Sequence, residues 1–200
     1  MGDYVLYQPL TRADRITVLL YRAGVALAAV TLSALAAFLA LHGPLDARTS
    51  SLYFDFFLAA LYFSVGLSVF FIHLYIGIFK EYLKRLYYLA LVTLALVVMK
   101  GNGDAASYVS GAHLALLFLL PAAGCMAFIC AKEAFCFRLV EGYLLAIIMP
   151  LYLIALGAGA LGEGAAAPGL VLIAALFDLF AFRKVLMPIH VDIGDKSAYR

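Results

Sequence analysis

Six long apolar runs occupy most of this sequence, and they constrain the fold more strongly than any other feature. They cover residues 16–41, 51–79, 82–99, 108–131, 143–161 and 165–182, with short polar breaks between them. A helix needs about 20 mostly apolar residues to cross a bilayer. The runs are continuous and rich in Ala and Leu, whereas a transmembrane barrel shows alternating polar and apolar residues. The sequence therefore predicts an all-α fold, a polytopic membrane bundle of six transmembrane helices.

The third and sixth runs are the least clear of the six. Their fully apolar cores, 86–99 and 169–177, are shorter than the bilayer is thick unless the flanking residues are counted. Whether these two helices span the membrane fully is therefore open at this stage.

Composition excludes several other classes of protein. Of the 200 residues, 66% are hydrophobic and 13% are charged, against about 45–50% and about 25% in soluble domains. This balance rules out a soluble enzyme and a disordered chain. The net charge of +2 is too small for a surface that binds nucleic acid. We expect the lipid bilayer to be the main surroundings of the chain, with a membrane-protein complex or a homo-oligomer as possible further partners.

The basic residues are distributed very unevenly between the two sides of the predicted bundle. Of the 14 Lys and Arg residues, all but Arg48 and Lys100 fall in segments on the same side. Cytoplasmic loops carry the excess of Lys and Arg in membrane proteins. The sequence thus predicts that both termini are cytoplasmic. It divides into an N-terminal segment 1–15, a transmembrane domain 16–182 and a C-terminal tail 183–200.

Ionisable residues within the apolar runs are the best pointers to a functional site, because each costs several kcal/mol unless it is paired or hydrated. Arg22 and Asp178 have similar predicted depths, so they either form an ion pair or Arg22 extends alone to the lipid headgroups. His73 either ligates a metal or haem, relays protons, or hydrogen-bonds a neighbouring helix, and the last interpretation is favoured.

The cysteines and the known catalytic motifs give no further assignment. Cys125, Cys130 and Cys136 have spacings that fit neither a zinc site nor a CxxC redox pair, so we predict no disulfide. Phosphate-binding loops, the HExxH motif and the GxSxG motif are absent. The sequence assigns no catalytic residue, no metal and no cofactor.

Two strings carry a resemblance to a known family. They are KEAFCF at 132–137 and DIGDKS at 192–197, accompanied by Tyr21-Arg22 and by His73-Leu74-Tyr75. With these strings the chain resembles the bacterial and cyanobacterial integral membrane proteins known as domain of unknown function 2301. The resemblance implies a compact protein of the bacterial inner membrane, or of the thylakoid in a cyanobacterium. It implies no activity, substrate or cofactor.

The resemblance and the predicted topology together place a candidate functional cluster at the cytoplasmic face. If the tail folds back, its imidazole and carboxylate groups meet a carboxylate and a thiol of the bundle, which is a ligand set for a transition metal. The favoured alternative is a tail docked by salt bridges, such as one from Asp192 or Asp195 to Lys132 or Arg138. The candidate residues are Arg22, His73, Lys132, Glu133, Cys136, Asp178, His190, Asp192 and Asp195.

Three functions are compatible with these features. The favoured one is a non-enzymatic accessory, assembly or subunit protein of a larger membrane complex that acts through its cytoplasmic face, because catalytic motifs are absent and the loops are short. The second is a membrane-embedded redox or metal-dependent enzyme that uses His73, Glu133, Cys136 and His190. The third, a small proton-coupled transporter using Glu133 or Asp178, is the weakest because few charges lie near the midplane.

The predicted orientation is tested with reporter fusions in the bacterial inner membrane. A fluorescent protein fused after Arg200 should fluoresce, and alkaline phosphatase at the same position should be inactive, because the tail is expected in the cytoplasm. The same phosphatase inserted at Gly103 should be active. The reverse pattern would contradict the prediction.

Overall fold

A computed structural model describes residues 10–42, 48–74 and 76–193 of the chain, and they form helices without a strand. A 3-10 segment, η1, precedes α5. The elements are α1 (Arg12–His42), α2 (Arg48–Phe71), α3 (Gly77–Lys100), α4 (Ala105–Gly111), η1 (His113–Leu119), α5 (Leu120–Phe137), α6 (Val140–Gly157), α7 (Glu163–Val185) and α8 (Ile189–Ile193).

The prediction of an all-α bundle with six membrane-spanning helices is confirmed. Six segments of the described chain are long and apolar enough to cross a membrane. The two runs that the sequence left open are both long enough, because α3 extends to Gly77–Lys100 and the sixth span covers Gly164–Val185. The chain is therefore an integral, multi-pass membrane protein.

The fourth predicted span, residues 108–131, begins too early. Tyr108 belongs to the short helix α4, and the backbone is extended at Ala112 before η1 begins. The fourth span thus covers His113–Phe137. Pro121 lies in the first turn of α5, where its missing N–H is tolerated, but a continuous α-helix through this point would bring its ring against a carbonyl of the preceding turn. A 3-10 segment followed by a new α-helix avoids this clash.

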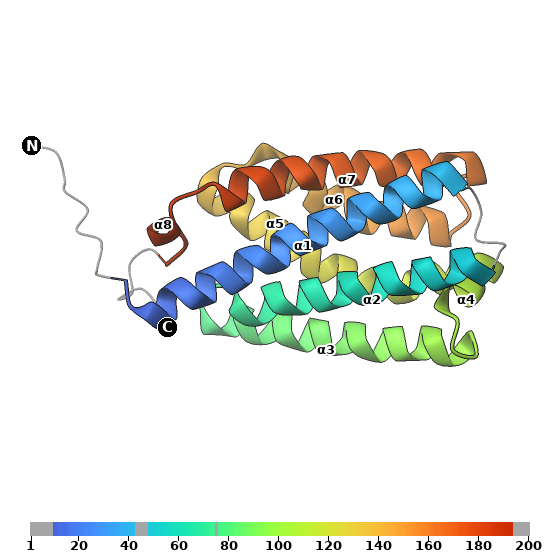
Figure 1. Ribbon diagram of the computed structural model, residues 1–200, viewed down its shortest axis with the longest axis horizontal. Helices are drawn as coiled ribbons and strands as arrows, with labels where there is room; N and C mark the ends of the chain where they lie inside the picture. The colour runs from blue at the N-terminus through green and yellow to red at the C-terminus, as the bar shows by residue number, and fades with distance from the viewer. Residues whose placement is uncertain (1–9, 43–47, 75, 194–200) are drawn as a thin grey trace, which may run out of the picture.

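The spanning helices run alternately up and down, and α1 lies between α2 and α7 (Figure 1). The helix α5 packs against α3 and α6 and so connects these two helices within the bundle. The close approach of α1 to α2 depends on Gly24, since a Cβ there would lie 2.4 Å from the Ser68 hydroxyl oxygen and 2.8 Å from the Ser64 carbonyl oxygen. Small residues at such crossings permit the backbone contact that holds membrane helices together.

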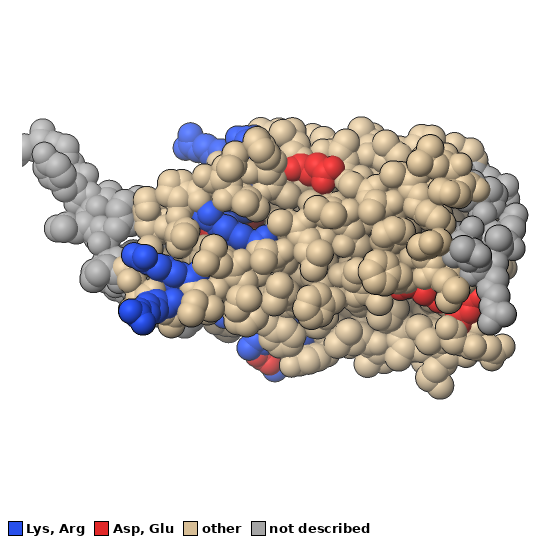
Figure 2. All heavy atoms as spheres, in the orientation of Figure 1, with Lys and Arg blue, Asp and Glu red and all other residues tan. Residues whose placement is uncertain are grey.

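The basic residues gather at one end of the bundle, as the blue atoms in Figure 2 show for the visible face. This is the end where α1 begins and α7 ends, and we call it the basic end. Beyond it the visible face is formed almost wholly by uncharged residues. The short helix α8 folds back at the basic end and contacts α1 (Figure 1).

Candidate functional site

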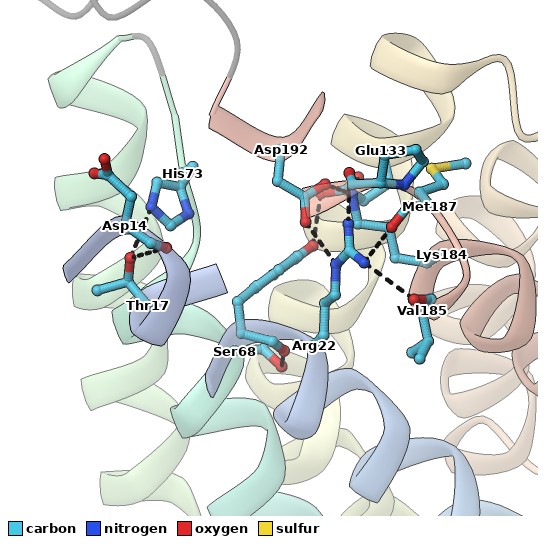
Figure 3. A network of polar contacts seen from close by, with 12 residues as sticks. Asp14, Thr17, Arg22, Ser68, His73, Glu133, Lys184, Val185, Met187 and Asp192 are labelled. Carbon is cyan, nitrogen blue, oxygen red and sulfur yellow. Dashed lines mark hydrogen bonds and ion pairs between the residues drawn. The ribbon is translucent and has the colours of Figure 1, made fainter. Parts of the chain in front are cut away.

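Arg22 joins α1 to the C-terminal segment of the described chain. Its Nε donates to Asp192 Oδ2 of α8 at 2.8 Å. Its Nη atoms donate to the carbonyl oxygens of Val185 at 3.0 Å and Pro188 at 3.1 Å, and also to that of Met187. The last carbonyls of a helix have no partner within the helix. A single guanidinium therefore binds the end of α7, the turn after it and the carboxylate of α8 (Figure 3).

Lys184, in the last turn of α7, lies between two carboxylates. Its side chain is fully buried, with Nζ 2.5 Å from Glu133 Oε2 of α5 and in contact with Asp192 Oδ1. The amine also lies 4.1 Å from the centre of the Phe137 ring, where the negative face of the aromatic system attracts a cation. Lys184 thus connects α5, α7 and α8 at one point.

Glu133 completes the cluster from α5. It is fully buried, and its Oε1 accepts hydrogen bonds from the Tyr21 hydroxyl and from Lys132 Nζ, both at 2.7 Å. Tyr21 itself is 1% exposed, so its hydroxyl needs this partner. We call the six residues of this cluster the charge network: Tyr21, Arg22, Lys132, Glu133, Lys184 and Asp192.

Enclosure determines the energetics of the charge network. Lys184 and Glu133 are both 0% exposed, and Arg22 and Asp192 are both 6% exposed. Transfer of such ions out of water costs several kcal/mol each, and this is offset only where every charge has a close opposite charge and its remaining hydrogen-bonding groups are satisfied. Each of the two carboxylates contacts two cations, which meets the first part of this condition. Glu133 Oε2 has no hydrogen-bond partner within the described residues and is neutralised by its ion pair with Lys184.

His73 lies apart from the charge network, in the turn between α2 and α3 (Figure 3). Its Nε2 is 3.1 Å from Thr17 Oγ1 of α1, and Thr17 donates its own hydrogen to a backbone carbonyl of α1. His73 Nε2–H is therefore the donor. The favoured interpretation of His73, a hydrogen bond to a neighbouring helix, is confirmed.

The protonation of His73 follows from its surroundings. Burial lowers the pKa of its imidazole from the ordinary value, and the positive charges of Lys80 and Lys132 lower it further, against smaller opposite effects of Asp192 and Asp14. Neutral imidazole is therefore the form that the folded protein favours. Nδ1 has no hydrogen-bond partner within the described ranges.

The hypothesis of an Arg22–Asp178 ion pair is wrong. Arg22 pairs with Asp192, and Asp178 instead accepts a 2.6 Å hydrogen bond from the Ser33 hydroxyl of α1. The alternative, in which Arg22 extends alone to the headgroups, is also wrong. The physical reason is the return of α8 to the bundle, which brings a carboxylate to Arg22 from the far end of the sequence.

The tail is docked by ion pairs, as the favoured interpretation proposed, but through different partners. Asp192 contacts Arg22 and Lys184 rather than Lys132 or Arg138. Asp195 lies outside the described residues. His190 is on α8 and half-buried, and Cys136 is an exposed free thiol at the end of α5. Among the described residues no group of three His, Cys, Asp or Glu side chains is arranged to hold a metal ion.

Sequence reasoning missed Tyr21 and Lys184 as members of the site. Lys184 was assigned to the tail because that segment was predicted to begin at residue 183, whereas α7 continues to Val185. Tyr21 precedes Arg22 in the string that carried the family resemblance. A signal was present in both cases, since each residue directly adjoins a charged residue at a membrane boundary.

The comparison with protein families now gives the class of this protein. The model of the family described as "Uncharacterized integral membrane protein (DUF2301)" matches residues 67–200, and the chain belongs to this family. The match contains His73, KEAFCF and DIGDKS, and it begins after Tyr21-Arg22. No curated protein and no solved structure matches the chain.

The charge network is tested by removal of its shared carboxylate. Asp192→Ala leaves Arg22 and Lys184 without a common counter-charge, so we expect it to lower the free energy of unfolding by about 3–5 kcal/mol. The measurement is thermal or denaturant unfolding of the purified protein in mild detergent. The control is Glu81→Ala, which breaks the exposed Glu81–Arg85 pair and should change stability by less than about 1 kcal/mol. Equal effects of the two variants would contradict a stabilising network.

The lowered pKa of His73 predicts a pH dependence of stability. Because the folded protein disfavours imidazolium, the unfolded chain takes up the proton first, and stability falls as the pH drops through about 6.5. His73→Gln removes this contribution. The melting temperature of the wild type should therefore fall relative to that of His73→Gln between about pH 7.5 and about pH 5.5. A constant difference between the two proteins would exclude the effect.

Proposed function

We propose that the protein is a non-enzymatic accessory or assembly subunit of a larger membrane complex, and that it contacts its partner through the basic end. We further propose that the membrane is the bacterial inner membrane, with the basic end in the cytoplasm. The family match supports an integral membrane protein, and it carries no information on activity.

One observation supports this proposal above all: the residues of the charge network pair with one another inside the protein. Its buried carboxylates are each held by two cations, and these contacts fasten α8 onto α1 and α7. Groups that perform acid–base chemistry lie within reach of a substrate, whereas Glu133 and Lys184 are enclosed on all sides. These ion pairs hold α8 in a fixed position against α1 and α7.

A fixed C-terminal segment gives the basic end a defined surface. The turn between α2 and α3, the turn between α5 and α6, and α8 together form this end. This end carries exposed cations such as Arg85 and Arg138 and exposed apolar residues such as Phe135 and Ile78. Arginine and aromatic residues are enriched where proteins bind each other, so this surface is suited to a protein partner.

The proposal is tested by purification of the tagged protein from its native membrane in mild detergent, followed by mass spectrometry of the co-purifying proteins. We expect at least one membrane protein in stoichiometric amount. The double variant Lys84→Glu/Arg85→Glu should reduce its recovery, because it reverses charge at the basic end, while Lys100→Glu at the opposite end should leave recovery unchanged. A protein that runs alone in every preparation would overturn the proposal.

A further inference from the structure

Two charged side chains of the spanning part of α7 lie outside the charge network, Arg183 and Asp178, and Arg183 has an ion-pair partner in Glu141 whereas Asp178 has none within the described residues. It is exposed, and α7 ends at Val185, so Asp178 lies about 10 Å inside that end at about 1.5 Å rise per residue. Its partner Ser33 lies about 16 Å along α1 from Arg22 by the same measure. The Ser33–Asp178 hydrogen bond joins α1 to α7 along their contact. The carboxylate thus faces the hydrocarbon of the bilayer.

One hydroxyl does not satisfy this carboxylate. An ionised Asp has two oxygens with about four acceptor positions, and Ser33 supplies a single hydrogen bond. No Lys or Arg within the described segments pairs with Asp178. A lone charge at such a depth costs several kcal/mol, and such residues normally face the interior of a bundle.

The surface beside Asp178 is a shallow groove between α1 and α7. Three small residues, Ala26, Ala29 and Ala181, form part of its wall, and the larger residues Val30, Phe182, Val185 and Leu186 form the rest beside Asp178. Its volume of about 240 Å³ is below the range of about 300–1,000 Å³ typical of small-molecule pockets. Small residues on adjacent helices allow the backbone of a further helix to approach closely. The groove therefore suits a helix that inserts one side chain beside Asp178.

Charge complementarity identifies the kind of helix. The cations of this chain nearest to Asp178 in depth are already engaged, because Arg22 and Lys184 belong to the charge network and Arg183 pairs with Glu141 at 2.8 Å. A second copy docked symmetrically in the groove would bring two Asp178 carboxylates together. No Lys or Arg of the described residues forms an ion pair with Asp178, which favours a different polypeptide as the source of the cation.

We propose that the groove between α1 and α7 binds a transmembrane helix of another protein, and that a Lys or Arg of that helix forms an ion pair with Asp178 inside the bilayer. This interaction surface lies within the membrane, so it goes beyond the proposed contact at the basic end. Either contact can exist without the other.

The test uses the purified, full-length protein reconstituted in phosphatidylcholine vesicles and a synthetic helix of known sequence. The probe is an alanine–leucine peptide of about 22 residues with one lysine about 10 Å from one end, and the reference peptide has leucine in that place. Energy transfer between labelled protein and labelled peptide measures association. We expect the lysine peptide to associate at least about tenfold more tightly than the leucine peptide.

The preference should depend on Asp178 alone. Asp178→Asn keeps the size of the side chain and should abolish the preference for lysine, while Glu81→Gln, an exposed acid outside the groove, should retain it. Photo-crosslinking from position 30, in the groove, should capture the lysine peptide, and crosslinking from position 92, on the lipid-facing side of α3, should not. Equal binding of both peptides, an unchanged preference in Asp178→Asn, or crosslinks only to lipid or to a second copy would overturn the proposal.

Discussion

The need to neutralise charge next to a bilayer determines the arrangement of this protein. Arg22 and Asp192 are 170 residues apart in the chain, and their ion pair at 2.8 Å ties the first spanning helix to the C-terminal segment. Lys184 extends the same contact to Glu133 of α5. Each of these groups would be strongly unfavourable alone. The positions of α1, α5, α7 and α8 at this end are therefore interdependent.

Apolar packing selects one arrangement of the helices less strongly than the charge network does. Inside a membrane, lipid tails are as apolar as leucine, so helices gain no hydrophobic free energy when they associate. Close contacts such as that of Gly24 with Ser68 fix neighbouring pairs of helices. The charge network adds a further condition, because its ion pairs form only when α1, α5, α7 and α8 bring these residues together. We therefore interpret its main effect as conformational specificity, which is a hypothesis for this protein because ion pairs can often be replaced without loss of stability.

Most of the fold was predictable from the sequence, and only part of the site was. Hydropathy gives the six spans because a bilayer has a fixed thickness. The same pattern does not reveal that α8 returns to the bundle, and this return brings Asp192 rather than Asp178 to Arg22. The start of the fourth span depended on backbone geometry at Ala112, which composition does not reveal. The hydrogen bond of His73 to a neighbouring helix was predicted, because a histidine within an apolar run needs a polar partner, whereas its place in the turn between α2 and α3 was not predicted.

Glu133 and Asp178 are both carboxylates within spanning helices, and the protein neutralises the first but not the second. Glu133 of α5 is fully buried, and it receives two ammonium groups, from α5 and α7, and a phenol hydroxyl from α1. Asp178 lies between two helices with an open side, and it receives one serine hydroxyl. Hydrogen bonds to a carboxylate offset its desolvation only when they are several or include a cation. The described chain therefore supplies cations to one acid and none to the other, so the energetics of the α1–α7 face depend on what lies beside Asp178 in the membrane.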